Sequence, residues 1–389
     1  MTRFVLHIGT AKTGTTALQA YLARNRRALL AAGTLYPDLR LWGLPLGLKN
    51  HNALSAEVAG RRSGIGITAE AAFDQLRDQA AKAGVQQVVL SAEGFTGHPD
   101  ALLFDTEAAF REAEAAYIAR LRALLDGAEV RVLVYLRRQD LWLESLANQR
   151  IKYAGTNSGP SFSTIEEFAR GLAPRLDYRR SLSVWAATFG EDALMVRPYE
   201  RPSLEGGSVI TDALAQIGLA GFTGTDVPAG DLRAANTALS RDVLEWKIRL
   251  DQAEPGRRRR SEREFLADAL REISAEMGGA VLPLMSPRQA RDLLDTHATG
   301  NAEIARRWMK RPDGRLFTAP EPDGTEPPAA WHGLSPEVAA EIDARLAAKR
   351  ASPQGRRRLR ELRLAEAIQH QPQWLRACLR LVRDRLRGL

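Results

Sequence analysis

Short apolar runs alternate with longer amphipathic stretches in the first half of the chain. The runs are rich in Val, Leu and Ile and lie at 4–8, 85–90, 130–136 and 193–200. Runs of this length, bounded by glycine or polar residues, are typical of buried parallel strands. Between them, apolar residues recur at helical spacing over 68–84 and 106–125. The alternation predicts an α/β fold with a central, mainly parallel sheet flanked by helices in three layers.

The second half of the chain is predicted to be mainly helical. Periodic apolar positions indicate helices at 209–217, 242–250, 262–277 and 287–307. The segment 38–66, by contrast, is rich in glycine and polar residues and is predicted to be a loop. We expect one large domain over 1–318, with a core over about 1–200 and a helical part over 201–318. A proline-rich linker over 319–328 and a basic helical tail over 329–389 follow.

Composition and charge exclude several classes of protein. With 389 residues, 44% of them hydrophobic, the chain can bury a sizeable core. The net charge of +8 is concentrated at the end, because 349–389 holds twelve Lys and Arg but only three Asp and Glu. A near-neutral body argues against a nucleic-acid-binding protein. The single cysteine, Cys378, and six scattered histidines exclude an internal disulfide and predict no structural metal.

The sequence predicts a cytoplasmic protein, since it has no apolar run long enough to span a bilayer and no signal pattern before the first strand. The tail offers two alternatives. Its last segment places Trp374, Leu379 and Leu386 on one helical face and arginines opposite. Such a basic amphipathic helix packs onto the body or a second subunit, or binds peripherally to an anionic inner leaflet.

The first apolar run leads directly into a candidate phosphate-binding loop, Gly9-Thr10-Ala11-Lys12-Thr13-Gly14-Thr15-Thr16. A helical pattern follows it, so the loop lies at a helix N-terminus, where unpaired amides and the helix dipole attract anions. The P-loop pattern G-x-x-x-x-G-K-[ST] can be laid over the segment, but Thr15 stands where the lysine belongs and the lysine is Lys12. A plain turn rich in Thr and Gly is the alternative.

A lysine before the second glycine, followed by Thr-Gly-Thr-Thr, resembles the 5′-phosphosulfate loop of sulfotransferases that use 3′-phosphoadenosine 5′-phosphosulfate (PAPS). In that family the 3′-phosphate is held by an arginine at a strand end and a serine eight residues later. Arg137 and Ser145 have this spacing, and Arg138 is an alternative to Arg137. About two helical turns bring the hydroxyl back beside the guanidinium, where both can hold one phosphate.

Further segments resemble the bacterial carbohydrate-type branch of these sulfotransferases, namely Leu176-Asp177-Tyr178, Val196-Arg197-Pro198-Tyr199-Glu200 and the stretch 301–317. The resemblance covers most of 1–317 and none of the tail. It implies a P-loop-like fold with a donor-binding core over about 1–200. The Arg-Lys-Gly closing loop of the soluble small-molecule sulfotransferases is not found in this sequence. The run Arg257–Arg260 is either solvated or binds an acidic glycan or the nucleotide.

Glu93 and His51 are the candidates for the residue that accepts the acceptor's proton. Glu93 comes just after the second apolar run, at a strand end that points into the same crevice as the loop, and is the preferred base. Family members use either a histidine or a glutamate for this role. The alternatives for Glu93 are a metal-binding carboxylate or a helix cap. His51 lies in the long loop-like segment and is otherwise a histidine bonded to a neighbouring backbone group.

The resemblance implies in-line transfer of a sulfuryl group from PAPS to a hydroxyl, with an amine the less favoured acceptor. Lys12 and the amides of Thr13, Gly14, Thr15 and Thr16 would stabilise the leaving phosphate oxygen. Arg137 and Ser145 would hold the 3′-phosphate. No metal is expected. The expected acceptor is a saccharide or glycolipid.

Two other functions remain open from the sequence. In a P-loop kinase, Glu93 would hold magnesium, Lys12 would take the Walker role, and ATP binding would need a divalent ion. In a non-catalytic binding protein, the nucleotide site would be retained and the basic tail would contact a membrane or glycan.

Overall fold

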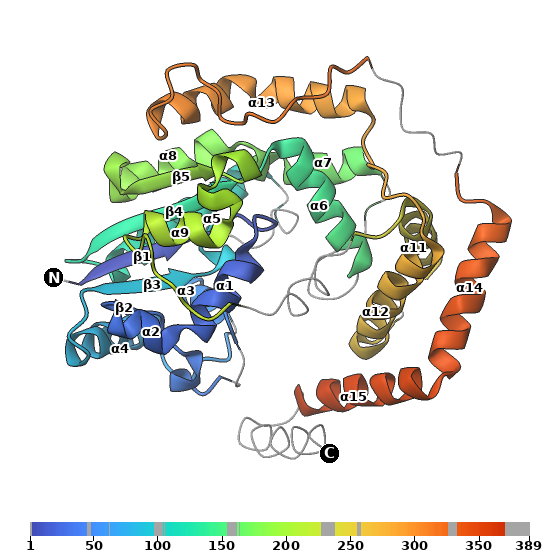
Figure 1. Ribbon diagram of the computed structural model, residues 1–389, viewed down its shortest axis with the longest axis horizontal. Helices are drawn as coiled ribbons and strands as arrows, with labels where there is room; N and C mark the ends of the chain where they lie inside the picture. The colour runs from blue at the N-terminus through green and yellow to red at the C-terminus, as the bar shows by residue number, and fades with distance from the viewer. Residues whose placement is uncertain are drawn as a thin grey trace. The chain divides into compact units, whose positions relative to one another are not determined.

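A computed structural model describes residues 2–44, 48–61, 63–96, 104, 106–153, 162, 164–226, 238–254, 258–325 and 333–369. The fold is α/β, as predicted, and its centre is a five-stranded sheet in the order β2-β3-β1-β4-β5 (Figure 1). Every pairing in this sheet is parallel. The strands are β1 (Arg3–His7), β2 (Thr34–Leu35), β3 (Gln87–Ser91), β4 (Glu129–Leu136) and β5 (Leu194–Pro198).

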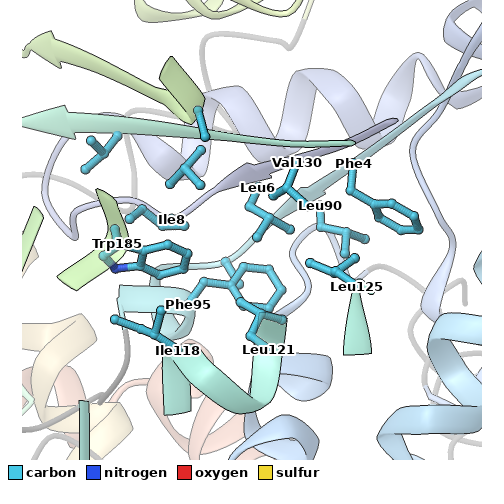
Figure 2. Packing of buried hydrophobic residues seen from close by; sticks show 14 of the residues in the cluster. Phe4, Leu6, Ile8, Leu90, Phe95, Ile118, Leu121, Leu125, Val130 and Trp185 are labelled. Carbon is cyan, nitrogen blue, oxygen red and sulfur yellow. The ribbon is translucent and has the colours of Figure 1, made fainter. Parts of the chain in front are cut away.

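The central strand β1 has buried neighbours on both faces of the sheet. Phe4, Leu6 and Ile8 point to one face and join a cluster with residues of the helices α4 (Ala69–Lys82), α5 (Glu107–Leu124) and α8 (Tyr178–Phe189). Val5 points to the other face and packs with α1 (Thr15–Arg24) and α9 (Val209–Gln216). Figure 2 shows the first cluster. Alternate side chains therefore bury both faces, which gives the predicted three layers.

The chain forms two compact units, each built from three stretches. The first comprises Met1–Leu143, Gly171–Asn236 and Arg288–Thr325 and contains the sheet. Its other described helices include α2 (Arg26–Ala31), α3 (Asn52–Val58) and most of α13 (Pro287–Arg307), together with short 3-10 turns. The helices α6 (Gln139–Lys152) and α7 (Ile165–Leu176) each have residues in both units. The predicted division at residues 318 and 329 remains a prediction.

The second unit comprises Glu144–Arg170, Thr237–Pro287 and Glu326–Leu389. Its described helices include α11 (Arg241–Ala253), α12 (Arg260–Met277), α14 (Pro336–Ala351) and α15 (Pro353–Gln369). Ion pairs join the beginning of the basic tail to α12, namely Lys349 with Glu272 (2.8 Å), Arg358 with Asp268 (2.8 Å) and Arg363 with Glu262 (2.7 Å). The described part of the tail therefore packs on a helix of its own unit. The amphipathic helix expected after Trp374 lies outside the described residues.

Two of the three described arginines in the run 257–260 are ion-paired. Arg258 contacts Asp251 (3.2 Å) and Glu254 (2.8 Å), and Arg260 contacts Glu264 (2.7 Å). Arg257 lies outside the described residues. These pairs use the guanidinium groups of Arg258 and Arg260 within the second unit, whereas Arg259 is exposed.

Three elements differ from the sequence prediction. The segment predicted to be a loop over 38–66 contains the 3-10 helix η1 (Leu39–Trp42) and the helix α3. The prediction was wrong there because seven residues are too few to show helical periodicity. The short edge strand β2 was also missed, since two residues carry no alternation. Within the described ranges, none of the helices combines the length and apolarity needed to cross a membrane.

Candidate active site

The loop after β1 is anchored through three successive carbonyl groups. The carbonyl of Thr10 accepts a hydrogen bond from the Thr13 hydroxyl (2.5 Å). The carbonyl of Ala11 accepts from Trp142 Nε1 (2.9 Å), and that of Lys12 accepts from Arg137 Nη1 (3.2 Å). In a trans peptide, the N–H of the following residue points away from the carbonyl. The anchors therefore turn the amides of residues 11–13 away from the groups that hold the loop.

The backbone amides of residues 11–16 form a run of unused donors. Within the part of the chain that the structure describes, none of them donates a hydrogen bond. Gly14, the N-cap of α1, has a left-handed φ of 75°, and no side chain caps the helix. Unpaired amides at a helix N-terminus carry partial positive charge and commonly bind phosphate or sulfate groups.

A side chain at position 14 would be strained by the left-handed backbone and crowded by its neighbours. A Cβ added there would lie 2.9 Å from Val209 Cγ1 and 3.1 Å from the Tyr199 ring. We expect Gly14→Ala to lower the free energy of unfolding by about 2–4 kcal/mol, through backbone strain and overpacking. Urea denaturation measures the loss. Gly84→Ala is the matched control, since Gly84 has a φ of 66° and no neighbour within 4 Å, so only strain of about 1–2 kcal/mol is expected. Equal losses would show that the contacts of Gly14 are unimportant.

Lys12 and Arg137 bring two positive charges to the loop. Both side chains are half-buried, and burial lowers the pKa of each below its ordinary value. The nearby charge of Arg137 lowers the pKa of Lys12 further, whereas Glu93 raises it. Two like charges in a partly desolvated site are unfavourable unless an anion neutralises them. The pair therefore favours binding of a multiply charged anion.

Arg138, the alternative to Arg137, is used inside the protein. It makes two 2.8 Å hydrogen bonds to the carboxylate of Asp140 and donates to the carbonyls of Ala319 (3.2 Å) and Pro320 (2.6 Å). The geometry thus favours Arg137 as the anion-binding residue. Ser145 is half-buried in the part of α6 that belongs to the second unit. Its pairing with Arg137 stays a prediction.

Glu93 stands beside the loop, at the start of the 3-10 helix η2 (Glu93–Thr96) that follows β3. Its Oε1 accepts a hydrogen bond from the Thr15 hydroxyl (2.5 Å), and its Oε2 accepts one from Asn52 Nδ2 (3.1 Å). Asn52 Oδ1 in turn accepts from the amide of Gly94 (3.2 Å). The carboxylate is held in place by these contacts and keeps lone pairs that can accept a proton. Its role as a base stays a prediction.

His51 has the contacts of a structural histidine. Its ring is fully buried, Nδ1 accepts from the amide of Ser91 (2.9 Å), and Nε2 lies 3.3 Å from the carbonyl of Pro37. Because Nδ1 is an acceptor, the proton is on Nε2 and is donated to Pro37. Burial lowers the pKa of His51 to about 4. Of the two roles that the sequence left open for His51, the geometry favours the backbone-bonded one.

The two buried histidines should make stability depend on pH. Burial also lowers the pKa of His7, to about 4, and an unfolded histidine titrates near 6.5. Between these values the unfolded chain binds more protons, so the stabilisation is complete above pH 6.5 and is lost as pH falls towards 4. Between pH 7.5 and 5.0 we expect each histidine to remove about 2 kcal/mol from the free energy of unfolding.

Urea denaturation at the two pH values measures this effect. His51→Gln is expected to remove about half of the difference. A free energy of unfolding that does not change between pH 7.5 and 5.0 would contradict the burial of neutral histidines.

A cavity of about 360 Å³ lies beside Glu93, within the first unit. Its lining includes Thr10, Ala11 and Glu93, residues of α3, α5, α6, α8, β4 and η2, and the side chains of Arg61 and Arg175. Apolar side chains make up most of the wall, including Ile8, Phe110, Val134, Leu136, Leu182 and Trp185. Concave, largely apolar spaces with a few polar groups are typical of small-molecule sites. The loop and Glu93 therefore adjoin space for a second molecule.

Sequence reasoning missed three residues that hold the site together. Trp142 anchors the loop, Asn52 orients Glu93, and the Tyr178 hydroxyl donates to the carbonyl of Arg137 (2.8 Å). Asn52 lies in the polar run that follows Lys49, and this run was a sequence signal for a functional segment. The indole of Trp142 and the phenol of Tyr178 give no such signal. No group of three or more His, Cys, Asp or Glu able to hold a metal occurs among the described residues.

Comparison with known proteins does not assign a family. No family model matches the chain, and no solved structure matches it. An uncharacterized protein of Archaeoglobus fulgidus is 35% identical over 111 residues, or 28% of this chain. The chain spans 28% of the length of that relative, whose name carries no activity.

Proposed function

We propose that this protein is a sulfotransferase that transfers the sulfuryl group of PAPS to a hydroxyl acceptor. The observation that carries the proposal is the run of six unused amides at residues 11–16, beside the half-buried cations of Lys12 and Arg137. A donor with two phosphate groups and a sulfate matches this concentration of positive charge. The resemblance of the loop sequence to a phosphosulfate loop supports it.

Each residue of the site has a defined part in the proposed reaction. Lys12 and the loop amides stabilise the negative charge that gathers on the leaving phosphate oxygen. Arg137 holds the 3′-phosphate, and the part of Ser145 in holding it stays a sequence prediction. Glu93 accepts the proton of the acceptor hydroxyl while Thr15 and Asn52 keep its carboxylate in place. A sulfuryl group carries less charge than a phosphoryl group, which fits the expectation that no metal is needed.

A second candidate function is phosphoryl transfer from ATP and magnesium. The contact between the Thr15 hydroxyl and Glu93 favours it, because P-loop enzymes use a hydroxyl of the loop and a carboxylate at a strand end to hold Mg²⁺. Against it, the lysine of the Walker pattern is absent at Thr15. A cytoplasmic location and contact of the tail with a membrane surface stay sequence predictions.

Calorimetric titration with adenosine 3′,5′-bisphosphate (PAP), and separately with ATP and magnesium, tests the proposal. We expect PAP to bind without metal, and Arg137→Ala to weaken its binding by about tenfold or more, since a charged hydrogen bond contributes about 1.5–3 kcal/mol. Arg288→Ala, an exposed arginine of α13, is the control and should leave the affinity unchanged. If ATP with magnesium binds and PAP does not, the kinase is favoured. If neither nucleotide binds, the non-catalytic function is favoured.

A further inference from the structure

We infer that the cavity beside Glu93 takes the acceptor and that the acceptor is an apolar alcohol or phenol rather than a saccharide. The inference rests on the proposed function and concerns the second substrate of the same site. It follows from two properties of the cavity, the apolar character of its walls and the state of the polar groups between them.

The apolar walls come from both the sheet and the helices that cover it. Ile8, Val134 and Leu136 contribute the sheet side, and Leu182 and Trp185 of α8 contribute the helix side. Phe110 of α5 adds an aromatic ring. Covering such walls with another apolar surface is favourable because it removes both surfaces from water. Aromatic rings favour flat partners.

Several of the polar groups that line the cavity are hydrogen-bonded within the protein. Ser55 Oγ lies 2.8 Å from the Tyr117 hydroxyl, and the Tyr178 hydroxyl donates to the carbonyl of Arg137. Arg175 donates to the Thr96 hydroxyl (2.9 Å). The indole of Trp142 is used by the loop, as described above. Each of these contacts uses a donor within the protein, so fewer donors remain for the many hydroxyls of a sugar.

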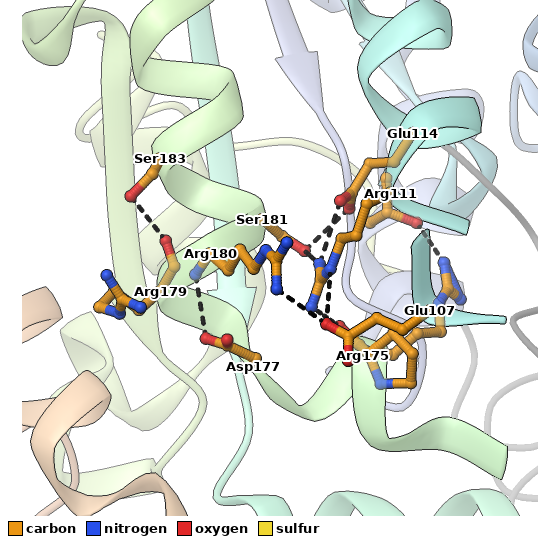
Figure 3. A network of polar contacts seen from close by, with 11 residues as sticks. Glu107, Arg111, Glu114, Arg175, Asp177, Arg179, Arg180, Ser181 and Ser183 are labelled. Carbon is orange, nitrogen blue, oxygen red and sulfur yellow. Dashed lines mark hydrogen bonds and ion pairs between the residues drawn. The ribbon is translucent and has the colours of Figure 1, made fainter. Parts of the chain in front are cut away.

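The charge of Glu114, another residue of the lining, is neutralised by an ion pair. Glu114 is only 2% exposed, contacts Arg111 Nη1 (3.1 Å), and accepts a hydrogen bond from the Ser181 hydroxyl (2.8 Å). Arg111 also donates to the carbonyl of Pro174 (2.6 Å). Figure 3 shows this network between α5 and α8. Glu114 therefore lines the cavity as an ion-paired group, and the remaining charged residues of the lining are Arg61, Glu93 and Arg175.

Glu93 is the polar group that adjoins the reaction. A buried sugar would leave several hydroxyls without partners, which is unfavourable, whereas an apolar alcohol needs a partner only for its reacting hydroxyl. In the inferred reaction, the acceptor oxygen forms a bond to sulfur, and the bond from sulfur to the 5′-phosphate oxygen breaks to release PAP. The proton of the hydroxyl passes to Glu93.

Sulfation assays with PAPS and two acceptors, 2-naphthol and N-acetylglucosamine, test the inference. We expect kcat/KM to be at least tenfold higher for 2-naphthol. Ala56→Phe places a ring in the cavity from α3 and should raise the KM for 2-naphthol at least tenfold, while the affinity for PAP stays unchanged. Ala59→Leu, a smaller change in the same wall, should act in the same direction. Ala81→Phe, at an exposed position of α4, is the control and should change neither value.

The outcomes separate this inference from the proposed function. Preference for N-acetylglucosamine, or an unchanged KM in both Ala56→Phe and Ala59→Leu with PAP still bound, would overturn the apolar acceptor and leave the sulfotransferase proposal intact. If PAP does not bind and PAPS is not consumed, the sulfotransferase proposal fails, and with it the assignment of the cavity to an acceptor.

Discussion

Replacing Lys12 with glycine is expected to lower kcat for sulfuryl transfer by about 10²–10³-fold without lowering thermal stability. In the proposed reaction, the loss follows from removing the cation that would stabilise the leaving oxygen. Stability is preserved because Lys12 has a φ of 67°, a left-handed conformation that glycine adopts without strain. The strain relieved, about 1 kcal/mol, roughly offsets the greater conformational entropy that glycine gives the unfolded chain.

Lys310→Gly is the matched control for this experiment. Lys310 also has a left-handed φ, of 56°, but it is exposed and lies on the turn after α13. The same change of residue and the same relief of strain should leave kcat unaltered there. The kcat and the melting temperature of both variants measure the catalytic and the structural effect of the change separately. If Lys12→Gly keeps full activity in a folded protein, Lys12 does not act on the leaving group.

Replacing Glu93 with glutamine is expected to lower kcat by about 10²–10⁴-fold, the usual contribution of a general base. The substitution is nearly isosteric, and the amide oxygen can still accept a hydrogen bond from Thr15 or Asn52. Binding of PAP should therefore change little. Steady-state kinetics and calorimetric titration with PAP measure the two properties separately.

Glu112→Gln is the control for Glu93→Gln, because Glu112 is exposed on α5 and is not part of the cavity wall. It should behave as the unmodified protein. Wild-type kcat in Glu93→Gln would exclude Glu93 as the base. A loss of magnesium-dependent ATP binding in the same variant would instead identify Glu93 as a metal ligand and favour the kinase.

Apolar pattern and length predicted most of the fold. Four of the five strands and the helix α13 follow from the sequence because each buries a continuous or periodic set of apolar residues. The strand β2 and the helix α3 do not follow from it. They are short, and contacts far along the chain hold them, such as the hydrogen bond between Gln87 and Thr34 and that between Ser55 and Tyr117.

The candidate site was predictable where backbone geometry sets it. The loop and Glu93 follow strand ends, and parallel strands bring their carboxyl ends to one edge, so their proximity could be inferred. The position of His51 near that edge could also be inferred, because it lies in a polar segment. Its burial could not, because it depends on how Tyr36 and Ser91 pack around the ring. The anchoring role of Trp142 depends on the rotation of α6, which the sequence does not specify.

The three carbonyl anchors of the loop also bear on the thermodynamics of binding. Because Trp142, Arg137 and Thr13 fix the loop while the chain folds, its conformational entropy is lost at folding and not when an anion arrives. Affinity then carries no cost for ordering the backbone, and association needs no rearrangement of the loop. If the loop binds an anion as proposed, Lys12 and Arg137 should speed its association, and the association rate should fall as ionic strength rises.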